Sequence, residues 1–259
     1  MPIIKSGEAR IHYELEGQCG SSVLVFSNSL GTNYSMWDPQ AREFRKKFRV
    51  LRHDTRGSGQ SSLTLGPYSI EQLAKDVLAL LDALDLDRVH FCGLSMGGMI
   101  GMWLGVNAPE RLNKLVLCNT AARIGTPETW NARIDAVQKN GMKSIAPAVV
   151  ERWFSPVFRQ NAPATISSTQ KMIEETNSDG YSACCAAVRD FDFREQVSRI
   201  RVPALVIAGA LDPATPPADG RFLAHQVPGA RYVELNAAHL SNIEDQDRFN
   251  NEVAAFLNS

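Results

Sequence analysis

One stretch of the sequence limits the choice of fold more than any other, and it runs from Val89 to Val106. Val89 to Cys92 is short and rich in β-branched and aromatic residues, which is typical of a buried strand. Gly93-Leu94-Ser95-Met96-Gly97 follows, and Met99 to Val106 is apolar apart from its glycines, which indicates a buried helix. A strand, a sharp turn that carries serine and a helix form the context in which Gly-x-Ser-x-Gly presents a nucleophile.

The turn predicts a chemical role for Ser95. A serine at a tight strand-to-helix corner has its hydroxyl pushed out above the sheet, and the residues two positions to either side must be small. Gly93 and Gly97 meet this requirement. Met96 begins the helix, so its backbone N–H is free to bind an oxyanion on whatever reacts with Ser95. The alternative is that the pattern arose by chance in a glycine-rich loop, but the flanking strand and helix favour a nucleophile.

The rest of the chain continues the alternation of strand and helix. The expected strands are Ile3–Ile4 and Ile11–Leu15 (a hairpin), Val23–Phe26, Phe48–Arg52, Leu115–Cys118, Ala204–Ala208 and Arg231–Leu235. The expected helices are Pro39–Lys47, Ile70–Leu84, Pro217–Gln226 and Ile243–Leu257. This order implies right-handed crossovers and predicts an α/β fold with a mostly parallel sheet of about eight strands and helices on both faces.

The alternation is interrupted between residues 125 and 197. This segment has helical periodicity and little strand signal, and prolines divide it. We expect a helical cap over residues 125–197, inserted into a core made of residues 1–124 and 198–259. Trp130, Arg133, Ile134 and Val137 share one helical face, which should point inward.

Composition excludes several classes of protein. With 259 residues, 44% hydrophobic and 21% charged, and a formal charge of −1, the chain has no signature of disorder, nucleic-acid binding or a polybasic membrane surface. Met96–Val106, the longest apolar run, is shorter than the roughly 20 residues of a membrane span. The five cysteines are odd in number, two fall in expected core strands, and none has a metal-ligand spacing. Because the N-terminus also lacks a signal-peptide pattern, we expect a cytoplasmic protein with reduced thiols. The oligomeric state stays open, a homo-oligomer included.

A serine nucleophile needs a base within hydrogen-bond reach and a carboxylate that orients the base. On a sheet of this type the order along the chain is serine, acid, histidine. Asp212 follows the Ala204–Ala208 strand and His239 follows the last strand, so we expect these two residues to be the acid and the base. Asp219 and His225 also follow Ser95, but both lie inside an expected helix. The alternative for Asp212 is a turn aspartate before a proline.

Two further loops follow strands near the expected site. The loop Ser27–Thr32 should supply a second oxyanion donor beside Met96, and we expect it to be the N–H of Leu30. The alternative is that Gly31 merely makes a turn. Asp54–Ser61 is rich in glycine but matches no phosphate-binding pattern, so we expect a structural turn in which Asp54 pairs with Arg56.

Taken together, these residues resemble the α/β-hydrolase fold family over nearly the whole chain. Within it, four stretches resemble the 3-oxoadipate enol-lactonases, which open an enol-lactone in bacterial aromatic degradation: Ser27–Thr32, Gly93–Gly105, Leu117–Gly125 and His239–Glu244. Ser58 and Gln246 depart from the usual pattern of these enzymes, and neither touches the expected chemistry. Ser95 stands where some branches of the fold carry a nucleophilic aspartate.

The resemblance implies a small anionic lactone as substrate, and no metal or cofactor. A cation should bind the carboxylate of the substrate, and Arg133 is the expected residue, with Arg123 and Arg152 as rivals. Trp130 and Trp153 would line the substrate-binding site. Two alternatives remain: a general carboxylesterase or cofactor-free perhydrolase on the same three residues, and a ligand receptor that keeps a hydrolase shell without turnover.

Overall fold

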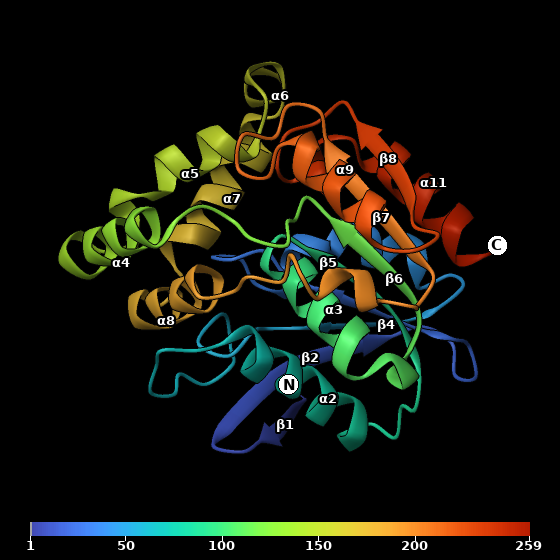
Figure 1. Cartoon of the computed structure of the whole chain (residues 1–259). Helices are drawn as coiled ribbons and strands as arrows, with labels where there is room; N and C mark the ends of the chain where they lie inside the picture. Colours follow the sequence, from blue (N-terminus) through green and yellow to red (C-terminus); the bar gives the residue numbers. More distant parts are fainter. Residues whose placement is uncertain (1) are drawn as a thin grey trace.

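The structure, a computed structural model, describes residues 2–259 and is built around an eight-stranded sheet (Figure 1). The strands are β1 (Ile3–Ser6), β2 (Ala9–Glu16), β3 (Val23–Ser27), β4 (Arg49–His53), β5 (Val89–Leu94), β6 (Leu112–Cys118), β7 (Ala204–Gly209) and β8 (Arg231–Leu235). Their order across the sheet is β1-β2-β4-β3-β5-β6-β7-β8. β1 and β2 pair antiparallel, β2 pairs antiparallel with β4, and all other neighbours are parallel. The expected fold class is therefore confirmed.

Helices cover both faces of this sheet. One face carries α2 (Ile70–Ala83), α3 (Met96–Asn107) and α9 (Pro217–Gln226), and the other carries α1 (Asp38–Phe44) and α11 (Gln246–Leu257). The central strands β3, β5 and β7 are buried along their whole length, as expected for parallel strands covered on both sides. Across residues 2–259, no helix is both long and apolar enough to cross a bilayer.

Between β6 and β7 the chain forms five helices: α4 (Pro127–Asn140), α5 (Ala146–Trp153), α6 (Pro156–Asn161), α7 (Pro163–Glu174) and α8 (Ser178–Arg189). Figure 1 shows them gathered in one group to the side of the sheet. We call residues 125–197 the helical segment. Its α8 packs closely on the sheet portion, because a Cβ on Gly180 would lie 2.0 Å from the carbonyl oxygen of Gly57. Short 3₁₀ turns complete the chain: η1 (Tyr34–Trp37), η2 (Pro109–Arg111), η3 (Met142–Ser144) and η4 (Val197–Arg199).

The closing helix differs from the sequence prediction, because it is two helices, α10 (Ser241–Glu244) and α11. Asp245 between them has φ −122° and ψ 54°, which is not helical. The Glu244 carboxylate at this break accepts the backbone N–H of Ala238 at 3.0 Å and that of Ser155 at 3.2 Å. The break thus allows Glu244 to join the loop after β8 to the start of α6.

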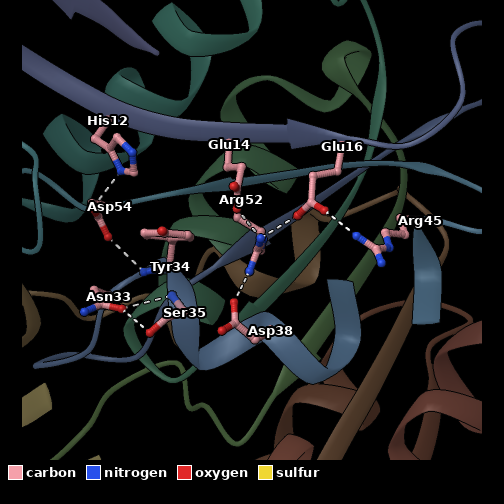
Figure 2. Close-up of polar contacts among 10 residues, drawn as sticks. All are labelled: His12, Glu14, Glu16, Asn33, Tyr34, Ser35, Asp38, Arg45, Arg52 and Asp54. Carbon is pink, nitrogen blue, oxygen red and sulfur yellow. Dashed lines mark hydrogen bonds and ion pairs between the residues drawn. The ribbon is translucent and has the colours of Figure 1, made fainter. Parts of the chain in front are cut away.

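The predicted pairing of Asp54 with Arg56 is wrong. Figure 2 shows that Asp54 instead accepts hydrogen bonds from His12, at 2.9 Å, and from the backbone N–H of Tyr34, at 2.8 Å. Arg56 forms a two-pronged ion pair with Asp76 of α2, at 2.6 and 2.8 Å. Asp54 therefore connects β2 with η1, and Arg56 connects the same turn with α2.

A second group of charges lies beside Asp54 and fixes the start of α1. Figure 2 shows the buried guanidinium of Arg52 between the carboxylates of Glu14, Glu16 and Asp38. Arg52 also lies over the ring of Tyr34, 5.2 Å from its centroid. These contacts connect β2, β4 and the first residue of α1, so they hold in place the segment that directly follows the Ser27–Thr32 loop.

Candidate active site

The strand-to-helix corner at Ser95 has the geometry that the sequence predicts. β5 ends at Leu94, α3 begins at Met96, and Ser95 between them has φ 58° and ψ −113°, a backbone conformation that costs free energy for any residue except glycine. A Cβ on Gly93 would lie 2.1 Å from the carbonyl oxygen of Gly97. Gly93 is therefore required by the close approach of strand and helix.

Backbone contacts hold Ser95 from the neighbouring strand β6. The N–H of Ser95 donates to the carbonyl of Cys118 at 2.9 Å, and the hydroxyl of Thr120 donates to the carbonyl of Ser95 at 2.7 Å. Met96 occupies the first position of α3, where a backbone N–H has no partner inside the helix. This donor belongs to the residue that follows Ser95 in the chain, so it can reach an oxyanion that forms at the Ser95 hydroxyl.

The buried carboxylate of Asp212 is fully hydrogen-bonded. Its Oδ1 accepts the backbone N–H groups of Ala214 and Thr215, and its Oδ2 accepts Thr215 Oγ1 at 2.6 Å, Asn119 Nδ2 at 2.9 Å and His239 Nδ1 at 2.8 Å. Burial by itself raises the pKa of Asp212, but the charge of His239 and these donors outweigh it and lower the pKa to about 2. The carboxylate therefore stays ionised at neutral pH.

His239 faces both Asp212 and the cavity that contains Ser95. Its Nδ1 is bound to Asp212, and its ring stacks near Trp153 with the ring centroids 6.1 Å apart. Ser95 and His239 line the same cavity, although no hydrogen bond joins their side chains anywhere in the described residues 2–259. Catalytic hydrogen bonds of this kind are often long before substrate binds and tighten in the complex.

The loop after β3 lies against the start of α3. The N–H of Gly97 donates to the carbonyl of Asn28 at 3.0 Å, and a Cβ on Gly97 would lie 2.2 Å from the carbonyl oxygen of Ser27. The Met36 sulfur accepts both the N–H of Ser29 and the hydroxyl of Thr32. Leu30, the expected second donor, lies between these fixed points and lines the cavity with Ser95.

The cavity has a volume of about 270 Å³ and is bounded by both the sheet portion and the helical segment. Its lining residues are Ser29, Leu30, Ser95, Ile124, Gly125, Thr129, Trp130, Arg133, Arg152, Trp153, Tyr181, Val188, Pro213, Ala214, Thr215 and His239. All the residues that the sequence predicted for the site line this cavity, except two. Asp212 lies behind His239, and Met96 lies beside Ser95 at the start of α3. None of the lining residues is acidic.

Two arginines supply the charge of this cavity. Arg133 lies over the ring of Trp130, 5.2 Å from its centroid, and Nη1 donates to the hydroxyl of Tyr181 at 3.4 Å. Burial, together with the charge of Arg133, lowers the pKa of Arg152. Within residues 2–259, neither arginine forms an ion pair with a carboxylate. Arg123, the third candidate, is absent from the lining and lies 3.6 Å from Asp192.

Sequence reasoning overlooked three residues of the site. Asn119 and Thr215 both donate to Asp212, and Tyr181 lines the cavity beside Arg133. Asn119 carried a usable signal, because it directly follows a strand, and Asp212 and His239 also lie in loops that follow strands. Tyr181 carried none, because helical periodicity does not show which loop of the sheet a cap helix covers.

Comparison with known proteins agrees with this geometry. Residues 22–246 match the model of the alpha/beta hydrolase fold family. The chain is 43% identical to 3-oxoadipate enol-lactonase 2 of Acinetobacter baylyi, covering 96% of this chain and 94% of that protein. It is 30% identical to a putative carbamate hydrolase, RutD, of Azorhizobium caulinodans, covering 99% and 98%. The crystal structure of the enol-lactonase from Burkholderia xenovorans LB400 superposes with a TM-score of 0.98 at 45% identity, covering all of both chains.

Proposed function

Because the chain belongs to the α/β-hydrolase fold family, we propose that Ser95, His239 and Asp212 form a catalytic triad that opens 3-oxoadipate enol-lactone to 3-oxoadipate. The observation that carries the choice of substrate is the pair of arginines, Arg133 and Arg152, in a cavity whose lining has no acidic residue. Such a cavity suits a small molecule with a carboxylate. The enol-lactonases that the chain resembles support the same substrate.

The mechanism follows from the positions of the side chains. Ser95 attacks the lactone carbonyl while His239 takes its proton, and Asp212 holds the imidazole by its Nδ1–H. The N–H groups of Met96 and Leu30 stabilise the oxyanion of the tetrahedral intermediate. When the ring C–O bond breaks, the leaving group is an enolate, which becomes a ketone on protonation. Water activated by His239 then hydrolyses the acyl-enzyme and releases 3-oxoadipate.

The arginines bind the carboxylate of the substrate at the other end of the cavity. Arg133 comes from α4 and Arg152 from α5, so the helical segment supplies both charges while the sheet supplies the triad. A guanidinium is the side chain best suited to a carboxylate, because its planar donors match the two oxygens. Trp130 lies under the guanidinium of Arg133 and Trp153 lies beside His239, so they form walls of the site.

We also assign this reaction to the cytoplasm, as a step of bacterial aromatic catabolism by the β-ketoadipate pathway. All five cysteines are free, and the sulfurs of Cys92 and Cys118 lie 3.7 Å apart without a disulfide. Free thiols in this number are typical of a reducing compartment.

The decisive measurement is the ultraviolet-monitored loss of 3-oxoadipate enol-lactone by the wild type and by Ser95→Ala, with a neutral nitrophenyl ester for comparison. We expect fast lactone turnover and slow ester turnover, both abolished in Ser95→Ala. Fast ester turnover with slow lactone turnover would keep the triad and replace the lactonase by a general esterase. Activity retained in Ser95→Ala would contradict the triad, and retention of the lactone without product would indicate a receptor.

A further inference from the structure

The Asn119 side chain forms more hydrogen bonds than its backbone conformation alone requires. It directly follows β6, is buried, and has φ 43°, a left-handed conformation that asparagine tolerates better than most residues. Its amide Nδ2 donates to Asp212 Oδ2 at 2.9 Å and to the carbonyl of Ala238 at 3.1 Å. Its Oδ1 accepts the hydroxyl of Ser241 at 2.6 Å. Both amide hydrogens are thus used, and they reach two different loops.

The loops after β6, β7 and β8 meet at this side chain. Gly209 at the end of β7 makes the meeting possible, because a Cβ there would lie 2.3 Å from the carbonyl oxygen of Ala238 and 2.9 Å from Asn119 Nδ2. The residues on either side of Asn119 hold the nucleophile: the Cys118 carbonyl accepts the N–H of Ser95, and Thr120 donates to the Ser95 carbonyl. Three consecutive residues therefore contact Ser95, Asp212 and the residue that precedes His239.

We propose that Asn119 is a positioning residue that sets the Asp212 carboxylate and the His239 loop in register with Ser95. The inference rests on the triad assigned under the proposed function. Thr215 also donates to Asp212 Oδ2, at 2.6 Å, but it lies three residues away in the same loop, and its contact with His239 Nδ1 on the other loop is long, at 3.5 Å. Asn119 is on another strand end, and it binds Asp212 and the residue preceding His239 with one rigid amide.

Asn119 acts on the chemistry through the charge of Asp212. Its N–H is one of three donors to Oδ2, and this hydrogen bond is among the contacts that lower the pKa of Asp212. Asp219 of α9 also lies near Asp212, and its pKa is raised by burial and by the charge of Asp212. Without Asn119, the pKa of Asp212 rises.

The test uses Asn119→Gly and Asn119→Ala. Both remove the amide, but glycine suits the positive φ and alanine does not, so the two variants differ in backbone strain and share the missing donor. The matched control is Asn242→Ala. Asn242 is equally buried, and its Nδ2 donates to the Met36 carbonyl and to Gln40 Oε1, away from the triad. The substrate is the neutral nitrophenyl ester, whose turnover needs the triad and not the arginines.

Loss of one hydrogen bond to a charged group should lower kcat by about 10- to 100-fold in both Asn119 variants, with KM changed less than about threefold. The acid limb of the kcat/KM profile should move to higher pH. In proton NMR, the low-field resonance of His239 Nδ1–H should shift or disappear. Asn242→Ala should lower the Tm but leave kcat, the pH profile and this resonance unchanged.

Two outcomes overturn the inference. One is a pH profile and a His239 resonance in Asn119→Gly that match those of the wild type. The other is a loss of kcat that follows the loss of Tm across all three variants, because that would make Asn119 merely structural. Ser95→Ala separates these outcomes from a failure of the proposed function: if it keeps esterase activity, the triad itself is wrong, whatever the Asn119 variants do.

Discussion

At the scale of single residues, we propose that Arg133 and Arg152 decide which substrate the cavity accepts. They approach it from different helices, and neither has a carboxylate partner within residues 2–259. Replacing either by glutamine should raise KM for the anionic lactone by about 10- to 100-fold, the effect of one charge-assisted hydrogen bond, and should hardly change KM for a neutral ester. Steady-state kinetics on both substrates measures the difference.

Arg123→Gln is the matched control for these variants, because Arg123 pairs with Asp192 outside the cavity lining. It should leave both KM values unchanged. If Arg133→Gln and Arg152→Gln also leave the lactone KM unchanged, the carboxylate binds elsewhere and the assignment of both arginines is wrong.

Single residues also show how far the sequence alone could go at the site. Ser95, Asp212 and His239 could be picked out because each follows a strand and because their order along the chain is serine, acid, histidine, and the structure brings them to one edge of the sheet. Their catalytic roles stay a prediction until they are measured. The partner of Arg56 could not be found in this way: the carboxylate nearest in sequence, Asp54, binds His12 instead, and the actual partner, Asp76, lies on a helix.

At the scale of elements, the sequence predicted all eight strands and the helices that cover the sheet, because apolar runs and periodicity report burial directly. Within residues 125–197 it predicted helices without the bounds of each. It did not predict the break between α10 and α11, which occurs beside tertiary contacts of Glu244 with Ala238 and Ser155 that no local sequence pattern reports. Nor did it give the order of the sheet, in which β4 lies between β2 and β3. The division into a core of residues 1–124 and 198–259 and a helical cap of residues 125–197 stays a prediction.

The contact between β5, α3 and the loop after β3 leads to a prediction at this scale. Gly97→Ala places a Cβ 2.2 Å from the backbone oxygen of Ser27, which no side-chain movement can relieve. Overpacking of this kind costs about 1–3 kcal/mol or more, so we expect the Tm to fall by roughly 2–12 °C, with loss of activity. Differential scanning calorimetry measures the change.

Gly105→Ala, on the same helix α3, tests whether the close approach of backbone atoms explains the effect of Gly97→Ala. A Cβ there would lie 3.2 Å from the end of the Leu115 side chain, which can move, and alanine favours the helix by about 1 kcal/mol. We expect its Tm to stay within about 3 °C of the wild type. Equal losses in the two variants would mean that the close approach at Gly97 is not the reason for the glycine.

At the scale of the whole molecule, Asp212 connects the site with stability in acid. Its pKa is about 2 in the fold, against 3.8 for an ordinary aspartate, so the unfolded chain takes up the proton first as the pH falls. Asp212 therefore contributes about 2 kcal/mol to the free energy of unfolding above pH 4, and this contribution is lost between about pH 4 and pH 2. Urea unfolding of the wild type and Asp212→Asn from pH 6 to pH 3 measures it. The gap between them should narrow as the pH falls, and a constant gap would contradict the low pKa.

The two unpaired guanidinium groups in the cavity have a further consequence, which concerns how the protein could be improved. Burial and the charge of Arg133 lower the pKa of Arg152, so a bound anion would stabilise the fold at this point. We propose that the two charges are kept together because they recognise the substrate, a compromise that is common at functional sites. Engineering for thermostability that selects on stability alone would remove these charges early. Its most stable variants would then have lost their affinity for an acidic substrate.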